Sequence, residues 1–191
     1  MDTAISAGSL LVATPLLADP NFRRTVVLVV EHAPGEGTLG VVLNRPTEVP
    51  VSRVLPPWAE LASGPSVVFQ GGPVALDSAL ALASVSGEGE PLGWRGLDGT
   101  PAVARLGLVD LDAPPEILAA EVGELRVFAG YAGWGADQLE GEIEQGAWYV
   151  MSAEPADAFA EDPAYLWRAV LRRQGGDLAL VATFPDDPTM N

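Results

Sequence analysis

The sequence predicts an α+β fold in which a mixed, largely antiparallel sheet carries several flanking helices. Segments rich in β-branched and apolar residues outnumber the helical ones and do not alternate strictly with them. The two strongest segments are joined by a short glycine-rich turn, which is typical of an antiparallel hairpin. A doubly wound parallel sheet would instead require a helix after each strand. We treat residues 1–191 as one domain with an ordered core at about residues 8–185.

The N-terminal third is predicted to consist of strands. Residues 10–13 form a short buried strand, and residues 25–31 form a central strand, because their β-branched side chains fit a pleated surface. A turn at residues 33–37 leads to a second strand at residues 38–44, so that the two longer strands make a hairpin. Pro46 ends this strand, since proline has no amide hydrogen to donate to a ladder.

The middle of the chain is expected to mix short strands with loops. Residues 51–55 form a helical turn, and residues 67–70 and 79–85 form strands. Residues 87–99 are rich in glycine and acidic residues, which predicts a mobile loop. Residues 103–111 show an alternating pattern, which predicts a further strand.

The C-terminal third is expected to alternate helices and strands. Proline is tolerated in the first turn of a helix, and basic residues suit the last turn. The predicted elements are a helix at residues 114–122, a strand at 125–129, a helix at 136–145, a strand at 147–151, a helix at 163–173 and a strand at 178–183. Residues 1–8 are expected to be frayed, and residues 186–191 to be a polar tail.

Composition predicts a cytoplasmic protein that binds neither nucleic acid nor membrane. Ten arginines and no lysine stand against 26 acidic residues, a formal net charge of −16, and such a field repels nucleic acids and anionic membranes. The doublets Arg23-Arg24 and Arg172-Arg173 are too few to form a nucleic-acid stripe. No apolar run approaches the roughly 20 residues that span a bilayer. The absence of cysteine excludes disulfides, and without a basic region before residues 10–12 we expect no signal peptide.

Residues 35–40 match the G-x-G-x-x-G pattern of dinucleotide-binding loops. Such a loop has to open a helix whose amides face the pyrophosphate. Here β-branched residues and then Pro46 follow, and Glu36 would place a negative charge among the phosphates. We therefore interpret the pattern as a hairpin turn and expect no cofactor.

His32 is the only histidine of the chain, so it cannot form a multi-histidine zinc site. Together with Glu31 it could act as a general base, but neighbours in a strand point to opposite faces. Asp110 and Asp112 could hold a divalent ion, yet they also fit a simple polar-out alternation. We favour a structural role for His32, expect no metal and assign no catalytic residue.

Two further motifs each leave two interpretations open. Asn44 and Arg45 stand at a strand end, where they could hold an anionic ligand, but Arg45 could equally be a structural ion-pair partner. The stretch from Gly130 to Trp134 is predicted to be a hinge between a strand and a helix, because glycine permits close backbone approach or positive φ. Its aromatic side chains could line a pocket or cap the core. In the following helix, Glu140 and Glu144 predict a solvated acidic face.

Taken in order, these segments resemble the YqgE/AlgH family of bacterial proteins, over about residues 10–183. The matching pieces are Pro15, Asp19-Pro20-Asn21-Phe22, Thr25-Val26, Glu31-His32, Gly40-Val41-Val42-Leu43-Asn44-Arg45-Pro46, Gly71-Gly72-Pro73-Val74, Gly130 to Trp134, Gln138-Leu139-Glu140 and Trp148. The resemblance implies that the mixed sheet curls into a partial barrel. It implies no established catalytic residue, and some members of the family are described as candidate transcriptional regulators.

We expect polar and aromatic residues at the strand ends to line one common hollow. These residues are Asp19, Asn21, Phe22, His32, Asn44, Arg45, Tyr131, Trp134 and Gln138. The resulting hypothesis is a cytoplasmic, non-enzymatic binding or regulatory module that acts through a protein partner or a small anionic ligand. The alternative is an enzyme acting on a phosphorylated or nucleotide-like molecule gripped by Arg45, and a weaker alternative is a regulator that binds DNA directly. The oligomeric state stays open.

Overall fold

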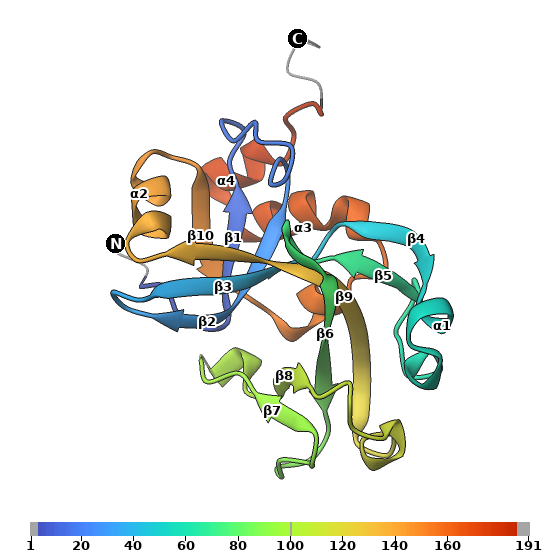
Figure 1. Cartoon of the computed structure of the whole chain (residues 1–191). Helices are drawn as coiled ribbons and strands as arrows, with labels where there is room; N and C mark the ends of the chain where they lie inside the picture. The colour runs from blue at the N-terminus through green and yellow to red at the C-terminus, as the bar shows by residue number, and fades with distance from the viewer. Residues whose placement is uncertain (1–3, 100, 187–191) are drawn as a thin grey trace.

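Ten strands form one strongly curled sheet that makes a half-barrel (Figure 1). The structure is a computed structural model that describes residues 4–99 and 101–186. The strand order is β10-β1-β2-β3-β9-β6-β8-β7, with β4 and β5 paired beside β9. Within the described part of the chain, β5 and β9 form the one parallel pair and the other strand pairs are antiparallel. The predicted α+β class and the partial barrel are therefore confirmed.

The elements follow one another with short connections. The strands are β1 (Ser9–Ala13), β2 (Val26–Ala33), β3 (Gly37–Val42), β4 (Pro46–Pro50), β5 (Val67–Gln70), β6 (Val74–Val85), β7 (Trp94–Gly96), β8 (Leu106–Val109), β9 (Val122–Gly135) and β10 (Trp148–Ser152). The α-helices are α1 (Val51–Val54), α2 (Gln138–Glu144), α3 (Leu166–Gln174) and α4 (Gly176–Val181). The 3-10 helices of the described residues are η1 (Pro56–Trp58), η2 (Pro101–Val103), η3 (Pro115–Ile117), η4 (Pro155–Phe159) and η5 (Pro163–Tyr165).

The predicted hairpin is present as β2 and β3, in which Leu28 pairs with Val41. The G-x-G-x-x-G pattern makes its turn, with Gly35 at φ +75°, and it leads into a strand and not into a helix. The hairpin interpretation of this pattern is confirmed. However, β3 ends before residue 44, and Pro46 begins β4, because an edge strand tolerates proline.

The stretch from Gly130 to Trp134 is not a hinge between a strand and a helix, which corrects the prediction. It lies inside β9, which runs for 14 residues and pairs with β3 at one end and β6 at the other. Gly130 has φ +75°, a left-handed conformation that permits β9 to bend between the part that pairs mainly with β6 and the part that pairs with β3. Figure 1 shows β9 crossing the molecule between the two halves of the sheet.

Both faces of the sheet carry a hydrophobic core, as the alternation of side chains along β1 shows. Leu10 and Val12 belong to the largest core, to which α3 and α4 also contribute. Leu11 and Ala13 point the opposite way, into a second core that includes Leu139 of α2. A third core packs α1 against β6 and β9. The helices therefore flank the sheet on different sides.

Three other segments differ from the prediction. Residues 178–183 begin in helix α4 and form no strand, because Leu178 and Val181, three residues apart, both pack on the core beside α3; so short an apolar run does not distinguish helix from strand. The predicted loop at residues 87–99 contains β7, whose buried Trp94 pairs with Val109. The helix expected at residues 114–122 is only η3, since the chain enters β9 directly afterwards.

The ends of the described chain are held more firmly than expected. Ala7 is buried and bridges to Gly99, although residues 1–8 were expected to be frayed. Asp186 contacts Arg23, Arg24 and Arg168. The rest of the predicted tail and residues 1–3 lie outside the described residues. Among the described helices, none combines the length and the apolar character needed to cross a lipid bilayer.

Candidate functional site

Four of the ten arginines line one small cavity of about 170 Å³. They come from three parts of the chain, namely the β1–β2 loop, the β3–β4 connection and α3. We call this cavity the arginine pocket; it is lined by Arg23, Arg24, Asn44, Arg45, Ala164, Trp167, Arg168 and Asp186. In a chain with a net charge of −16, this cavity therefore stands out as a local concentration of positive charge.

The β1–β2 loop is shaped by Asp19. Its carboxylate accepts the amide hydrogen of Asn21 at 2.9 Å, and its carbonyl accepts those of Phe22 and Arg23 at 2.9 and 2.8 Å. Asp side chains commonly stabilise such turns. The turn brings Arg23 and then Arg24, which has φ +60°, towards the start of β2. The predicted residues Asp19 and Asn21 therefore position the pocket's arginines without lining it.

Asn44 continues the β-ladder with its side chain where β3 has ended. Its Oδ1 accepts the amide hydrogen of Val26 at 3.0 Å, and its Nδ2 donates to the carbonyl of Arg24 at 2.8 Å. The oxygen and the nitrogen of the side-chain amide are thereby both hydrogen-bonded to the protein's own backbone. Asn44 fixes the backbone of Arg24, and this explains an asparagine at this strand end.

Arg45 clamps the same loop from the other side. Its guanidinium donates to the carbonyl of Pro20 at 3.1 Å and to that of Arg23 at 2.9 Å. Burial lowers the pKa of Arg45 from its ordinary value. No carboxylate of the described chain lies within ion-pairing distance of it, so the structure does not bear out the ion-pair interpretation. Arg45 keeps its positive charge at the pocket while holding the loop.

Trp167 is the floor on which two of the arginines stack. The guanidinium carbon of Arg24 lies 4.0 Å from its ring centroid and that of Arg168 lies 5.7 Å away. The indole nitrogen donates to the carbonyl of Ala13 at 2.8 Å, which fixes the ring. The pKa of Arg24 is lowered, first by burial and then by repulsion from Arg168, while Asp186 opposes this shift. An incoming anion would relieve the repulsion between these cations.

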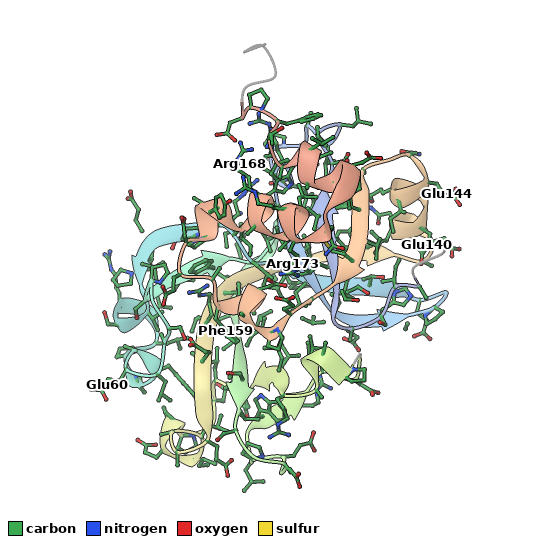
Figure 2. All side chains as sticks on the ribbon, turned by 180° about the vertical axis from the view of Figure 1, so that it is seen from behind. Glu60, Glu140, Glu144, Phe159, Arg168 and Arg173 are labelled. Carbon is green, nitrogen blue, oxygen red and sulfur yellow. The ribbon has the colours of Figure 1, made fainter. Side chains whose placement is uncertain are left out.

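The C-terminal segment lies against the arginine pocket, and Figure 2 shows Arg168 beside it. Arg168 donates to the carboxylate of Asp186 at 2.8 Å, and Arg24 lies 3.9 Å from the same oxygen. Arg23 and Arg24 also donate to the main-chain carbonyls of Asp186 and Pro185. The side chain of Asp186 nevertheless stays 88% exposed.

A second cavity of about 300 Å³ adjoins the arginine pocket and shares Arg23 and Arg24 with it. Its other lining residues are mostly apolar; they are Thr14, Pro15, Leu17, Ala18, Phe184 and Pro185. A ligand that carries both an anionic group and an apolar part would fit the pair of cavities, since pockets commonly combine apolar walls with a few polar groups.

Phe22, Trp134 and Gln138 belong to a different cluster, which docks α2 on the sheet. The rings of Phe22, Trp134 and Trp148 pack with centroids 5.6–6.0 Å apart. The carboxylate of Glu142 accepts from both indoles, at 3.4 and 3.2 Å, and from the side chain of Gln138 at 3.1 Å. Because Trp134 is only 5% exposed, it caps the core and lines no hollow.

Tyr131 and His32 lie away from the arginine pocket as well. Tyr131 is three residues before Trp134 in β9 and pairs with Val74, so its ring lies on the other face of the sheet. His32 shares a hydrogen bond of 2.7 Å with the hydroxyl of Thr38, as a structural histidine would. The nine predicted residues therefore do not line one common hollow, because a curled sheet turns neighbouring strand ends to different sides.

Sequence reasoning underrated the arginines that complete the pocket. Arg23-Arg24 was visible as a doublet, and Arg168 stands in the predicted C-terminal helix, but nothing local links them. Within residues 4–99 and 101–186, no three His, Asp or Glu side chains are grouped so that they could hold a metal ion.

Replacing Glu142 by alanine should destabilise the protein by about 2 kcal/mol, because Trp134, Trp148 and Gln138 lose their shared charged acceptor. Urea unfolding followed by tryptophan fluorescence measures this difference. Glu144→Ala is the matched control, since Glu144 lies on the exposed, acidic side of α2 (Figure 2), and it should change stability by less than about 0.5 kcal/mol. Equal effects of both substitutions would contradict this role of Glu142.

Comparisons with known proteins agree in pointing to one family. The family model described as AlgH-like matches residues 10–179. A UPF0301 protein of Streptomyces coelicolor is 62% identical over 188 residues, covering 96% of this chain and 94% of that protein; one of Thermobifida fusca is 57% identical over 194 residues, covering 100% and 98%. A crystal structure from Corynebacterium diphtheriae superposes with a TM-score of 0.87 at 33% identity, covering 95% of this chain and 93% of that one. The solution structure of the AlgH protein from Pseudomonas aeruginosa superposes with a TM-score of 0.67 at 27% identity, covering 98% of each chain.

Proposed function

This chain belongs to the AlgH-like family, and we propose that it is a non-enzymatic binding or regulatory module that captures an anionic group in the arginine pocket. The convergence of four guanidinium groups on one cavity of about 170 Å³ is the observation that carries this proposal. Guanidinium groups are suited to carboxylate and phosphate because their donors form a planar fork.

The fold supports binding because it holds the pocket in advance of any ligand. Asn44 and Arg45 fix the loop that carries Arg23 and Arg24, and Trp167 supports the two stacked guanidinium groups. Groups held in place by their surroundings lose little conformational freedom when a ligand binds.

The chemistry of the pocket favours binding over turnover. Its charged donors are arginines, whose guanidinium groups stay protonated at neutral pH and do not act as bases or nucleophiles. The amide of Asn44 and the indole of Trp167 transfer no proton either, and the carboxylate of Asp186, which also lines the pocket, is paired with Arg168 at 2.8 Å. An enzyme acting on a phosphorylated molecule would use the same four cations, so the test of the proposal has to include a measurement of turnover.

The proposal predicts that inorganic phosphate stabilises the protein at constant ionic strength, by about 2.7 kcal/mol at a concentration of 100 Kd. Arg23→Ala should weaken phosphate binding about tenfold to a hundredfold, because it removes a charged donor. Arg23 is exposed, and within the described residues its side chain makes one hydrogen bond, to the carbonyl of Asp186, so the fold should persist. Thermal unfolding against phosphate concentration provides the measurement.

Arg53→Ala is the matched control, because Arg53 is an exposed arginine on α1, outside the pocket. It should leave the phosphate response unchanged. Equal responses of the wild type, R23A and R53A would refute the arginine pocket as the binding site. If the wild type hydrolysed p-nitrophenyl phosphate and R23A did not, the binding-module hypothesis would be rejected in favour of an enzyme that acts on a phosphorylated molecule.

A further inference from the structure

Three arginines of the pocket already bind a piece of peptide, which is the chain's own segment from Phe184 to Asp186. This segment follows α4 and lines both cavities, with Phe184 and Pro185 in the larger one and Asp186 in the arginine pocket. The contact joins residues that are 163 positions apart in the sequence. It is therefore a feature of tertiary structure, and it shows which chemistry the pocket accommodates.

The arginines contact the segment mainly through its main chain. Arg24 donates to the carbonyl of Phe184 at 3.4 and 3.5 Å and also to that of Pro185. Arg23 donates to the carbonyl of Asp186, whose carboxylate receives Arg168 at 2.8 Å. Three successive carbonyls followed by one carboxylate make a pattern that belongs to a peptide and that a small inorganic anion cannot reproduce.

The side chains of the segment agree in polarity with the cavities that they line, apolar ones at the larger cavity and an acidic one at the arginine pocket. Phe184 and Pro185 form one apolar part of the wall of the larger cavity, and Pro15, Leu17 and Ala18 form another. Proline has no amide hydrogen, so it brings no donor towards the guanidinium groups. The sequence apolar–Pro–acidic thus places an apolar part beside the larger cavity and a negative charge beside the cations.

We propose that the arginine pocket and its neighbouring cavity form a receptor for an acidic peptide segment of a partner protein, and that residues 184–186 are its intramolecular competitor. This inference rests on the proposed function, because it requires that the pocket binds anionic groups, and it names the ligand as a peptide of the pattern apolar–Pro–acidic.

The intramolecular segment is held in a way that permits exchange. The Asp186 side chain is 88% exposed, and exposed ion pairs contribute little to stability. Phe184 is 44% exposed, so only part of its ring area is removed from water. A tethered segment competes through its effective concentration, which is in the millimolar range for short linkers. A partner peptide therefore binds the fraction of molecules in which the segment has left.

The test uses the full chain and a fluorescein-labelled peptide with the sequence Ala-Thr-Phe-Pro-Asp-Asp, which is that of residues 182–187. Asp186→Arg turns the attraction between the segment and the pocket into repulsion, at an exposed position where the fold does not depend on the side chain. We expect D186R to bind the peptide at least about tenfold more tightly than the wild type, in fluorescence anisotropy, because the competing segment is released.

Asp177→Arg is the matched control, since Asp177 is an exposed acid on α4 and does not line the pocket. Its substitution changes the net charge by the same amount as Asp186→Arg. It should change peptide affinity by less than about twofold. A peptide of the sequence Ala-Thr-Phe-Pro-Asn-Asn should bind D186R at least about tenfold more weakly than the acidic peptide, since it lacks the carboxylates.

Each remaining outcome decides between the two proposals. Equal peptide affinities of the wild type, D186R and D177R would overturn the proposal that residues 184–186 compete with a partner peptide. Failure of the acidic peptide to bind any of the three proteins, while phosphate still stabilises them through Arg23, would overturn the peptide receptor and leave the proposed function standing. If neither phosphate nor the peptide bound, both proposals would fail.

Discussion

Replacing Arg126 by alanine is expected to lower the free energy of unfolding by about 4 kcal/mol. Arg126 lies in β9 and is 1% exposed. Its guanidinium donates to the carbonyls of Gly64 at 2.7 Å, Ala160 at 3.0 Å and Ala158 at 3.4 Å, and it stacks on Phe69 at 4.3 Å. It thus ties two loops to the sheet. Burial lowers the pKa of Arg126 to about 10, so the group remains a cation at neutral pH.

The effect has two parts that a second variant separates. Alanine removes the donor that the carbonyls of Gly64, Ala158 and Ala160 share, and it also opens a cavity in place of the buried side chain. Arg126→Met keeps most of the volume and should cost about 2 kcal/mol, which is the share of the lost hydrogen bonds. Thermal unfolding should show a fall in Tm of about 8–16 °C for R126A. Arg53→Ala, an exposed arginine, serves as the control, and an R126M variant as stable as the wild type would show that the three carbonyls do not need Arg126.

Replacing Gly130 by alanine is expected to cost about 3 kcal/mol. Gly130 has φ +75°, and a Cβ there would lie 2.6 Å from the carbonyl oxygen of Gly72 and 2.9 Å from that of Val74. Both contacts are with backbone, so the sheet would have to shift where β9 bends. The substitution therefore combines the strain of a left-handed residue with a steric clash.

Gly133→Ala is the matched control in the same strand. A Cβ at Gly133 would make ordinary contacts, at 3.6 Å with Tyr131 and 3.7 Å with Leu39. We expect G133A to change the free energy of unfolding by less than about 1 kcal/mol, because the added methyl group meets no clash and alanine loses less conformational freedom in a strand than glycine does. Urea unfolding of both variants gives the comparison. Similar costs for the two positions would mean that Gly130 has no special backbone role.

The strands could be predicted from the sequence because their signal is local. The β-branched run at residues 25–31 and the glycine-rich turn that follows it determined a hairpin, and the structure shows it as β2 and β3. Where the local signal was ambiguous, the prediction failed. The apolar residues 178–183 fit a strand or a helix equally well, and only their packing beside α3 selects the helix.

The residues of the candidate site also fall into those that a local signal identified correctly and those whose surroundings gave them another role. Asn44 and Arg45 were recognisable as polar groups at a strand end, and both lie at the arginine pocket. Trp134 could have lined a pocket or capped the core, and it caps the core, while His32 makes the structural contact that we favoured for it. A residue type shows what chemistry a side chain can perform, and its surroundings decide whether that chemistry is used within the fold.

Local periodicity, composition and the order of motifs are enough to predict the α+β class, most of the strands, the negative charge and the resemblance to a family. The meeting of Arg23, Arg24, Arg45 and Arg168 beside Trp167 and Asp186 became visible only in the folded chain. Local preferences restrict each residue's backbone, but they carry no information about a partner 163 positions away. The curl of the sheet and the packing of α3 and α4 bring those partners together.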